Sequence, residues 1–121
     1  KFNTKKLEIK GRIFEIQNYF EGIARFNFDD LCAKNVGAED YIKIAEECNF
    51  IVIENIPIFH NNNEDKQQRF ITLIDILYEK KIPLMTSSHA ELKNFGSSRY
   101  LIKTFKRTLS RLYELTSIKL V

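Results

Sequence analysis

The stretch from Phe50 to Ser88, FIVIENIPIFHNNNEDKQQRFITLIDILYEKKIPLMTSS, decides the fold of this 121-residue chain. It contains an apolar run (Phe50–Ile53), a polar break, an amphipathic segment (Asp65–Lys81) and a second apolar run (Ile82–Thr86). The amphipathic segment has the spacing of one helical face, with apolar residues at Phe70, Leu73, Ile74, Leu77 and Tyr78. The pattern therefore predicts a strand, a helix and a strand, joined as a right-handed parallel βαβ unit. Such a sheet needs more strands than this stretch offers.

The first 28 residues predict antiparallel strands. Apolar residues alternate from Leu7 to Ile16, and again from Tyr19 to Phe28, which predicts two strands that form a hairpin or meander with one solvated face. Gly11 is expected to allow a bulge. In the second strand, Ala24, Phe26 and Phe28 are expected on one face, and Ile23, Arg25 and Asn27 on the other.

Two helices are expected before the first buried strand. Asp29 is predicted to cap a short helix that begins at Asp30 and is ended by residues 35–37. A metal or acid-base site at Asp29 and Asp30 is the alternative interpretation. A second helix is predicted from Ala38 to Cys48, with an inward face of Tyr41, Ile42, Ile44, Ala45 and Cys48.

The last predicted element is a helix from Thr104 to about Ser117. Its expected core face contains Phe105, Leu109, Leu112 and Thr116, while Lys103, Arg107 and Arg111 share another side because they lie four residues apart. The fold class is thus α/β: a β-hairpin or meander region over residues 1–28, then a parallel βαβ unit and a C-terminal helix within residues 29–121.

Composition excludes several classes of protein. The net charge of +3 is too small to indicate nucleic-acid binding, and no run approaches the roughly 18 apolar residues of a membrane-spanning helix. The first residue is Lys1 and KFNTKK lacks the apolar core of a signal peptide, so we expect a processed or excised chain. Cys32 and Cys48 lack the close spacing of zinc ligands and are predicted to be reduced, packed thiols, which favours the cytosol or the mitochondrial matrix.

Candidate residues for chemistry are few. The chain has no glycine-rich phosphate loop, no GxSxG motif and no metal-spaced histidine pair, and His60 and His89 both fall in predicted loops. Arg69, Arg107 and Arg111 are stronger candidates, because a guanidinium group binds phosphate through two parallel hydrogen bonds. The alternative interpretation is a surface ion pair, for instance with Asp75 or Glu114.

Several segments, in order and over residues 7–117, resemble the C-terminal part of the AFG-type, or ZapE-like, AAA+ ATPases, also called the lactation-elevated ATPase family. The matching segments are LEIKGR (Leu7–Arg12), FNFDDLC (Phe26–Cys32), GAEDY (Gly37–Tyr41), NIP (Asn55–Pro57), QRFITLID (Gln68–Asp75), LYE (Leu77–Glu79) and FKRTLSRLYEL (Phe105–Leu115).

The resemblance implies a P-loop ATPase that uses Mg-ATP, acts in cell division or protein quality control, and is located in the bacterial cytoplasm or the mitochondrial matrix, in some cases peripheral to the inner membrane. Family members carry their Walker motifs upstream, so ATP and Mg are expected to bind the missing half rather than this chain. By the resemblance, Arg107 and Arg111 match the terminal RxxSRLxE signature and Arg69 matches the second arginine of RRFI; arginine-finger or sensor roles are expected for them.

The same resemblance implies partners and shows departures. We expect the upstream half, protein partners and a homo-oligomer, and no specific nucleic acid. Gln68 replaces the first arginine of RRFI, Asn55 replaces the acid of the usual DxP turn, and Leu115 replaces a methionine. The alternative function is a non-enzymatic interaction module that docks a protein or a membrane through a strand edge or its basic helix.

Overall fold

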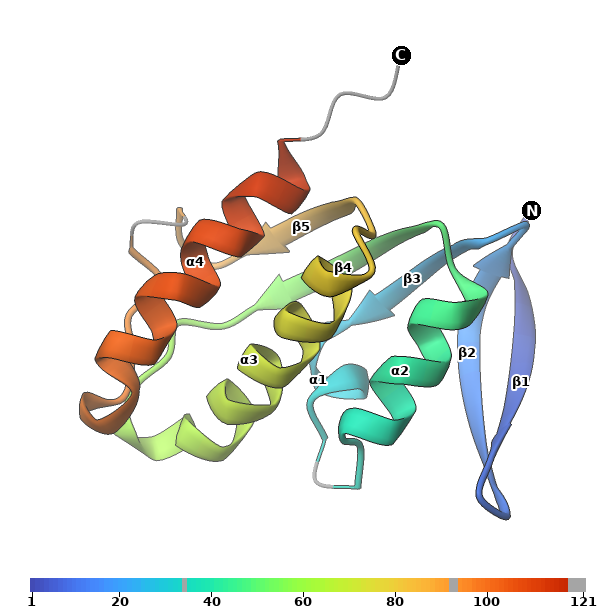
Figure 1. Ribbon diagram of the computed structural model, residues 1–121, viewed down its shortest axis with the longest axis horizontal. Coiled ribbons are helices and arrows are strands. Elements are labelled where there is room, and N and C mark those ends of the chain that lie inside the picture. Colours follow the sequence, from blue (N-terminus) through green and yellow to red (C-terminus); the bar gives the residue numbers. More distant parts are fainter. Residues whose placement is uncertain (34, 92–93, 118–121) are drawn as a thin grey trace.

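Five strands form one sheet in the order β1-β2-β3-β4-β5 in the computed structural model, which describes residues 1–33, 35–91 and 94–117 (Figure 1). The strands are β1 (Asn3–Ile9), β2 (Arg12–Phe20), β3 (Ile23–Asn27), β4 (Phe50–Ile56) and β5 (Leu84–Ser88). The helices are α1 (Phe28–Leu31), α2 (Ala38–Glu47), α3 (Glu64–Glu79) and α4 (Ile102–Thr116), with short 3-10 turns at η1 (Asn61–Asn63) and η3 (Arg99–Leu101). The predicted α/β class, with its meander, parallel unit and C-terminal helix, is confirmed.

The stretch that decides the fold is a parallel β4–α3–β5 unit, as predicted. β4 pairs with β5 in parallel, with Ile51 beside Leu84 and Ile53 beside Thr86. β4 runs three residues beyond the predicted Ile53, and Pro57 follows its last residue because proline cannot donate to the ladder. β3 also pairs with β4 in parallel, so the chain segment containing α1 and α2 is a second crossover connection.

The N-terminal region contains three strands, not the two predicted. β1, β2 and β3 form an antiparallel meander joined by two-residue turns, Lys10-Gly11 and Glu21-Gly22. All four turn residues have positive φ, between 45° and 87°, which is the geometry of tight hairpins. Gly11 therefore lies in a turn, and the predicted bulge at this glycine is wrong. The register shift of the β1–β2 ladder lies between Asn3 and Lys5.

The two helices after β3 differ in detail from the prediction. α1 begins at Phe28 and its cap is Asn27, whose Oδ1 accepts a hydrogen bond from the Asp29 amide. The cap therefore lies two residues before the predicted Asp29, and the error arises because asparagine and aspartate cap equally well. Gly37 does not end α1, which stops at Leu31, but precedes α2 as its N-cap. Ile42, predicted to face inward, is 43% exposed, since α2 turns only its other apolar residues to the core.

The core lies between the sheet and the helices α2, α3 and α4, which pack on one face of it (Figure 1). The predicted face of α3 is buried at Phe70, Leu73, Ile74 and Leu77, and that of α4 at Phe105 and Leu112. Four phenylalanines from distant segments meet there, with ring centroids 5.3 to 6.4 Å apart: Phe28, Phe59, Phe70 and Phe105. This aromatic cluster ties α3 and α4 to the end of β3 and to the loop after β4.

A buried polar connection joins α3 to the segment before α4. Gln67 is fully buried; its amide nitrogen donates to Ser97 Oγ at 2.8 Å, and its amide oxygen accepts from the Ser98 backbone at 2.9 Å. The Ser98 hydroxyl donates to Glu64 at 2.7 Å and also lies 3.3 Å from the Leu101 amide. This arrangement fixes where α4 begins, and so where its arginines lie relative to α3.

Candidate functional site on α3 and α4

Two of the three candidate arginines meet at one carboxylate. Asp75 of α3 accepts a hydrogen bond from Arg111 of α4, with Nη1 to Oδ1 at 2.8 Å, and its other oxygen lies 3.8 Å from Nη2 of Arg107. The side chain of Arg111 is 30% exposed and that of Arg107 is 59% exposed. Arg111 is therefore held at the helix interface, whereas Arg107 extends into solvent with a weak tether.

An aromatic ring, that of Tyr78, also contacts the guanidinium group of Arg111. The guanidinium carbon lies 4.7 Å from the ring centroid of Tyr78, and the Tyr78 hydroxyl donates to Glu114 at 3.1 Å. The hydrogen bond to Glu114 raises the pKa of Tyr78 above its ordinary value. Two arginines, two carboxylates and a tyrosine thus form an ion-pair network between α3 and α4, which we call the interhelical network (Arg107, Arg111, Asp75, Tyr78 and Glu114).

The structure does not bring Arg69 to this network. Arg69 leaves α3 on the side of α1, where Nη1 lies 3.4 Å from the Cys32 carbonyl and 3.4 Å from Asp65. Hydrogen bonds from the backbone amide of Lys66 and from Arg69 lower the pKa of Asp65 below its ordinary value. Arg69 and the interhelical network are separate features, each anchored to a different part of the core.

The surface ion pair weighed from the sequence is present: Asp75 is the partner of both α4 arginines. Glu114, the other partner considered, accepts from Tyr78 instead. Existing ion pairs leave the chemical role of the arginines open, because the same side chains can exchange partners when a phosphate is near.

The remaining candidates have structural roles. His60 Nδ1 accepts the Asn62 amide at 3.1 Å and caps η1. The backbone of His89 donates to Ile56 and closes the loop after β5. Asp29 pairs with Lys66 at 3.2 Å, and among the described residues no three His, Cys, Asp or Glu side chains lie close enough to bind a metal ion.

Comparison with known proteins identifies the family. The sequence model described as AFG1-like ATPase matches residues 1–121. The chain belongs to the AFG1-like ATPase family. It is 28% identical over 115 residues to cell division protein ZapE of Escherichia coli K12, covering 95% of this chain and 31% of ZapE. It is 33% identical over 86 residues to lactation elevated protein 1 homolog B of Danio rerio, covering 71% of this chain and 17% of that protein.

The resemblance to this family is confirmed, and the α/β architecture is consistent with part of a P-loop NTPase fold. No solved structure matches the chain. The chain spans less than a third of the length of either relative named here. The described part of the chain, residues 1–33, 35–91 and 94–117, has no helix long and apolar enough to cross a membrane.

Two AFG1-like segments that are distant in the sequence meet in space. Arg12, from the LEIKGR segment, reaches Asp40 of the GAEDY segment with Nη1 and Oδ1 2.8 Å apart. The Asp40 side chain is only 2% exposed, and its other oxygen accepts the Gly37 amide at the start of α2. Sequence analysis missed this pair: the acid at the third position of a helix is a recognisable capping signal, but nothing local indicates its arginine partner.

The departures from the AFG1-like pattern occupy tolerant positions. Asn55 has φ of +63°, a conformation that asparagine adopts more readily than most residues, and its amide donates to Ser87 Oγ at 3.0 Å. Gln68 is exposed on α3. Leu115 is 3% exposed and fills a core position, where exchange with the methionine that the resemblance implies conserves volume.

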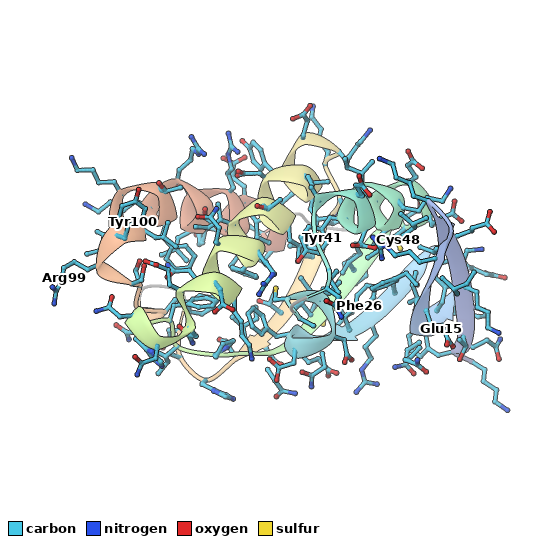
Figure 2. The ribbon with its side chains drawn as sticks, turned by 90° about the horizontal axis from the view of Figure 1, so that it is seen from below. Glu15, Phe26, Tyr41, Cys48, Arg99 and Tyr100 are labelled. Carbon is cyan, nitrogen blue, oxygen red and sulfur yellow. The ribbon has the colours of Figure 1, made fainter. Side chains whose placement is uncertain are left out.

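A hollow of about 690 Å³ lies at the start of α4, away from the interhelical network. Its lining includes Arg99, Lys103 and Tyr100, which is 87% exposed. Sequence analysis did not select Arg99 or Tyr100, because one exposed aromatic residue in a polar segment gives no periodic signal. Figure 2 shows both side chains at the end of the molecule opposite β1 and β2.

Proposed function

We propose that this chain is the C-terminal segment of an ATP-hydrolysing AFG-type AAA+ ATPase whose upstream half binds the nucleotide. The observation that carries the proposal is the family match over the whole chain, together with the two α4 arginines of the terminal signature at one solvent-facing network. Escherichia coli ZapE is named a cell division protein, and a related role in cell division or in protein quality control is proposed here.

The described residues do not fit a complete Mg-ATP site by themselves. The sequence lacks a P-loop motif, and the two α4 arginines share a single carboxylate, Asp75, with Arg111 held closely and Arg107 loosely. ATP and Mg belong, in this proposal, to the upstream half. No reaction step is assigned to the described residues beyond charge stabilisation by arginine, in cis or across a subunit contact of a homo-oligomer.

The geometry favours a different functional role for each of the three arginines. Arg107 is the most exposed of the α4 pair and its 3.8 Å contact with Asp75 is easily exchanged, so it suits a finger or sensor that reaches a phosphoryl group. Arg111 is fixed between Asp75 and the Tyr78 ring and suits a positioning role. Arg69, on the other side of α3, suits a separate sensor or subunit contact.

The test is ATP hydrolysis by this chain alone and after fusion to the upstream half. We expect no turnover by the isolated chain and measurable turnover by the fusion. Arg107→Ala is expected to reduce turnover by roughly 10³-fold if the residue acts as a finger. Lys106→Ala, at the neighbouring exposed position of α4, is the matched control. Turnover by the isolated chain contradicts the proposal.

A non-enzymatic interaction module is the second candidate, favoured by the fact that Arg111 is already paired with Asp75 at 2.8 Å. Its partner would be a protein or a membrane surface, in the bacterial cytoplasm or the mitochondrial matrix. If Arg107→Ala and Arg111→Ala leave hydrolysis unchanged but weaken partner binding, this candidate replaces the first.

A further inference from the structure

One face of the sheet has no described helix on it. Helices α2, α3 and α4 all pack on the other face, and Figure 2 shows α2 and α4 above the strands. The strand registers place Phe20 beside Ile23, Ile23 beside Phe50, and Val52 beside Met85, so these side chains share the uncovered face. We call this surface the open face (Phe20, Ile23, Phe50, Val52 and Met85).

The open face is apolar and accessible. Met85 is 58% exposed, Phe20 40% and Ile23 37%, while Phe50 and Val52 are half-buried. Parallel strands normally have both faces covered, and the uninterrupted apolar run Phe50–Ile53 in β4 is the sequence of such a strand. A contiguous apolar surface of this kind marks a contact with another layer of protein.

The charges on this face indicate what kind of layer covers it. Arg25 and Glu54 project from β3 and β4 onto the open face, with Nε and Oε1 2.8 Å apart. Glu54 neutralises Arg25, so the face has no excess positive charge for nucleic acid or anionic lipid. Further charges, Lys6, Glu8 and Glu15, lie on the same side of β1 and β2 at the margin. The apolar side chains thus share the face with one ion pair, since Arg25 lies directly beside Val52. Apolar contacts together with paired polar groups are the composition of a protein–protein interface.

We propose that the open face packs against the part of an AFG1-like ATPase that lies outside the segment matched here, its nucleotide-binding part. The matched segment is 31% of ZapE and 17% of the Danio rerio relative, so most of each relative lies outside it. In those relatives the two parts belong to one chain, and a face of modest area suffices when its partner is tethered. This inference rests on the proposed function.

The experiment uses Met85→Cys to introduce a thiol on the open face, which we call the probe thiol. The Met85 side chain is exposed, so the substitution leaves the fold intact, and the native Cys32 and Cys48 are buried and serve as sensors of folding. The variant is labelled with N-ethylmaleimide in two forms: as the isolated chain, and fused to the part of Escherichia coli ZapE that lies outside the matched segment. Tyr113→Cys introduces the control thiol at a position of α4 that is 65% exposed.

In the fusion, the probe thiol is expected to react at least about tenfold more slowly than in the isolated chain, while the control thiol reacts equally in both. The same unfused ZapE part, added in trans, is expected to protect the probe thiol in a concentration-dependent way. The readout needs no turnover, so a fusion that protects the probe thiol but does not hydrolyse ATP rejects the proposed function and keeps the interface.

Equal labelling of the probe thiol in both forms, with Cys32 and Cys48 still unreactive, overturns the inference. So does protection of the probe thiol in the isolated chain that rises with its own concentration and coincides with a dimer in sedimentation, because the occupant is then a second copy. Should the fused segment be unfolded, shown by labelling of Cys32, the mixture in trans decides: no protection there also overturns the inference.

Discussion

Asp75 and Arg111 face each other across the contact between α3 and α4, with Oδ1 and Nη1 2.8 Å apart and about a third of each side chain exposed. The pair joins residues 36 positions apart in the sequence, and it is the shortest contact of the interhelical network that involves an arginine. Whether it stabilises the fold or only orients the arginine is a question that double-mutant cycles answer.

We expect a small coupling energy for this pair. Because the side chains are partly exposed, Asp75→Ala and Arg111→Ala should couple by roughly 0.5–1 kcal/mol in urea unfolding. The cycle of Asp75 with Arg107 should give a coupling near zero, since that contact is 3.8 Å long and its arginine is 59% exposed. Equal couplings in the two cycles would contradict this distinction between a held and a free arginine.

Gln67 and Gln68 provide a matched pair of substitutions on α3. Gln67 is buried with both ends of its amide hydrogen-bonded, while Gln68 is exposed. Gln67→Ala leaves the Ser98 amide without its partner in a buried site and is expected to lower the free energy of unfolding by about 1–3 kcal/mol. Gln68→Ala should change it by less than about 0.5 kcal/mol. Similar urea midpoints for the two variants would show that the connection is unimportant for stability.

Two ion pairs join the N-terminal hairpin to the start of α2, and they differ in how deeply the acidic partner is buried. Arg12 pairs with buried Asp40, whereas Lys10 pairs with exposed Glu39 at 2.7 Å. Arg12→Ala leaves a buried carboxylate without its counter-charge, so it should lower the thermal midpoint more than Lys10→Ala, which breaks an exposed pair. Arg12→Lys should restore part of the loss. If Lys10→Ala lowers the thermal midpoint more than Arg12→Ala, then Asp40 accepts hydrogen bonds from water or from another donor once Arg12 is removed.

How far the sequence predicts this structure depends on the range of the interactions. The β4–α3–β5 unit follows from periodicity because its strands and helix each bury a regular set of residues, and α4 follows for the same reason. The turn at Gly11 was mistaken for a bulge because Ile13 continues the alternation of Leu7 and Ile9 along the sequence. Ile13 is in fact 57% exposed, and the two-residue turn moves the inward positions of β2 to Phe14 and Ile16.

Contacts between distant segments could not be predicted in this way. The residue types of Arg107, Arg111 and Asp75 suggested an ion pair. The separation of Arg69 from that pair depends on how α3 packs between α2 and α4. The Arg12–Asp40 contact depends on the twist of β1 and β2 over the start of α2, which no local pattern records. The open face could not be predicted either. Strand β4 has apolar residues on both of its faces, so its sequence does not indicate which face the helices of this chain cover.

The two cysteines give the chain a pH dependence of its stability. Burial raises the pKa of Cys32 to about 12, and burial and the nearby Glu47 raise that of Cys48 to about 12. A thiol in the unfolded chain has a pKa of about 8.5, so above that pH the unfolded state loses protons that the folded state keeps. Because the unfolded state then binds fewer protons, the free energy of unfolding falls as pH rises.

Between about pH 7.5 and 9.5, each thiol is expected to lower the free energy of unfolding by about 1.4 kcal/mol, measured by urea unfolding. The double variant Cys32→Ala/Cys48→Ala is less stable at about pH 7.5 because it creates cavities, but its stability should decline less steeply over the same interval. N-ethylmaleimide should label both native thiols slowly at neutral pH and rapidly in urea. An identical decline in the parent chain and the double variant would show that these thiols titrate alike in the folded and unfolded states.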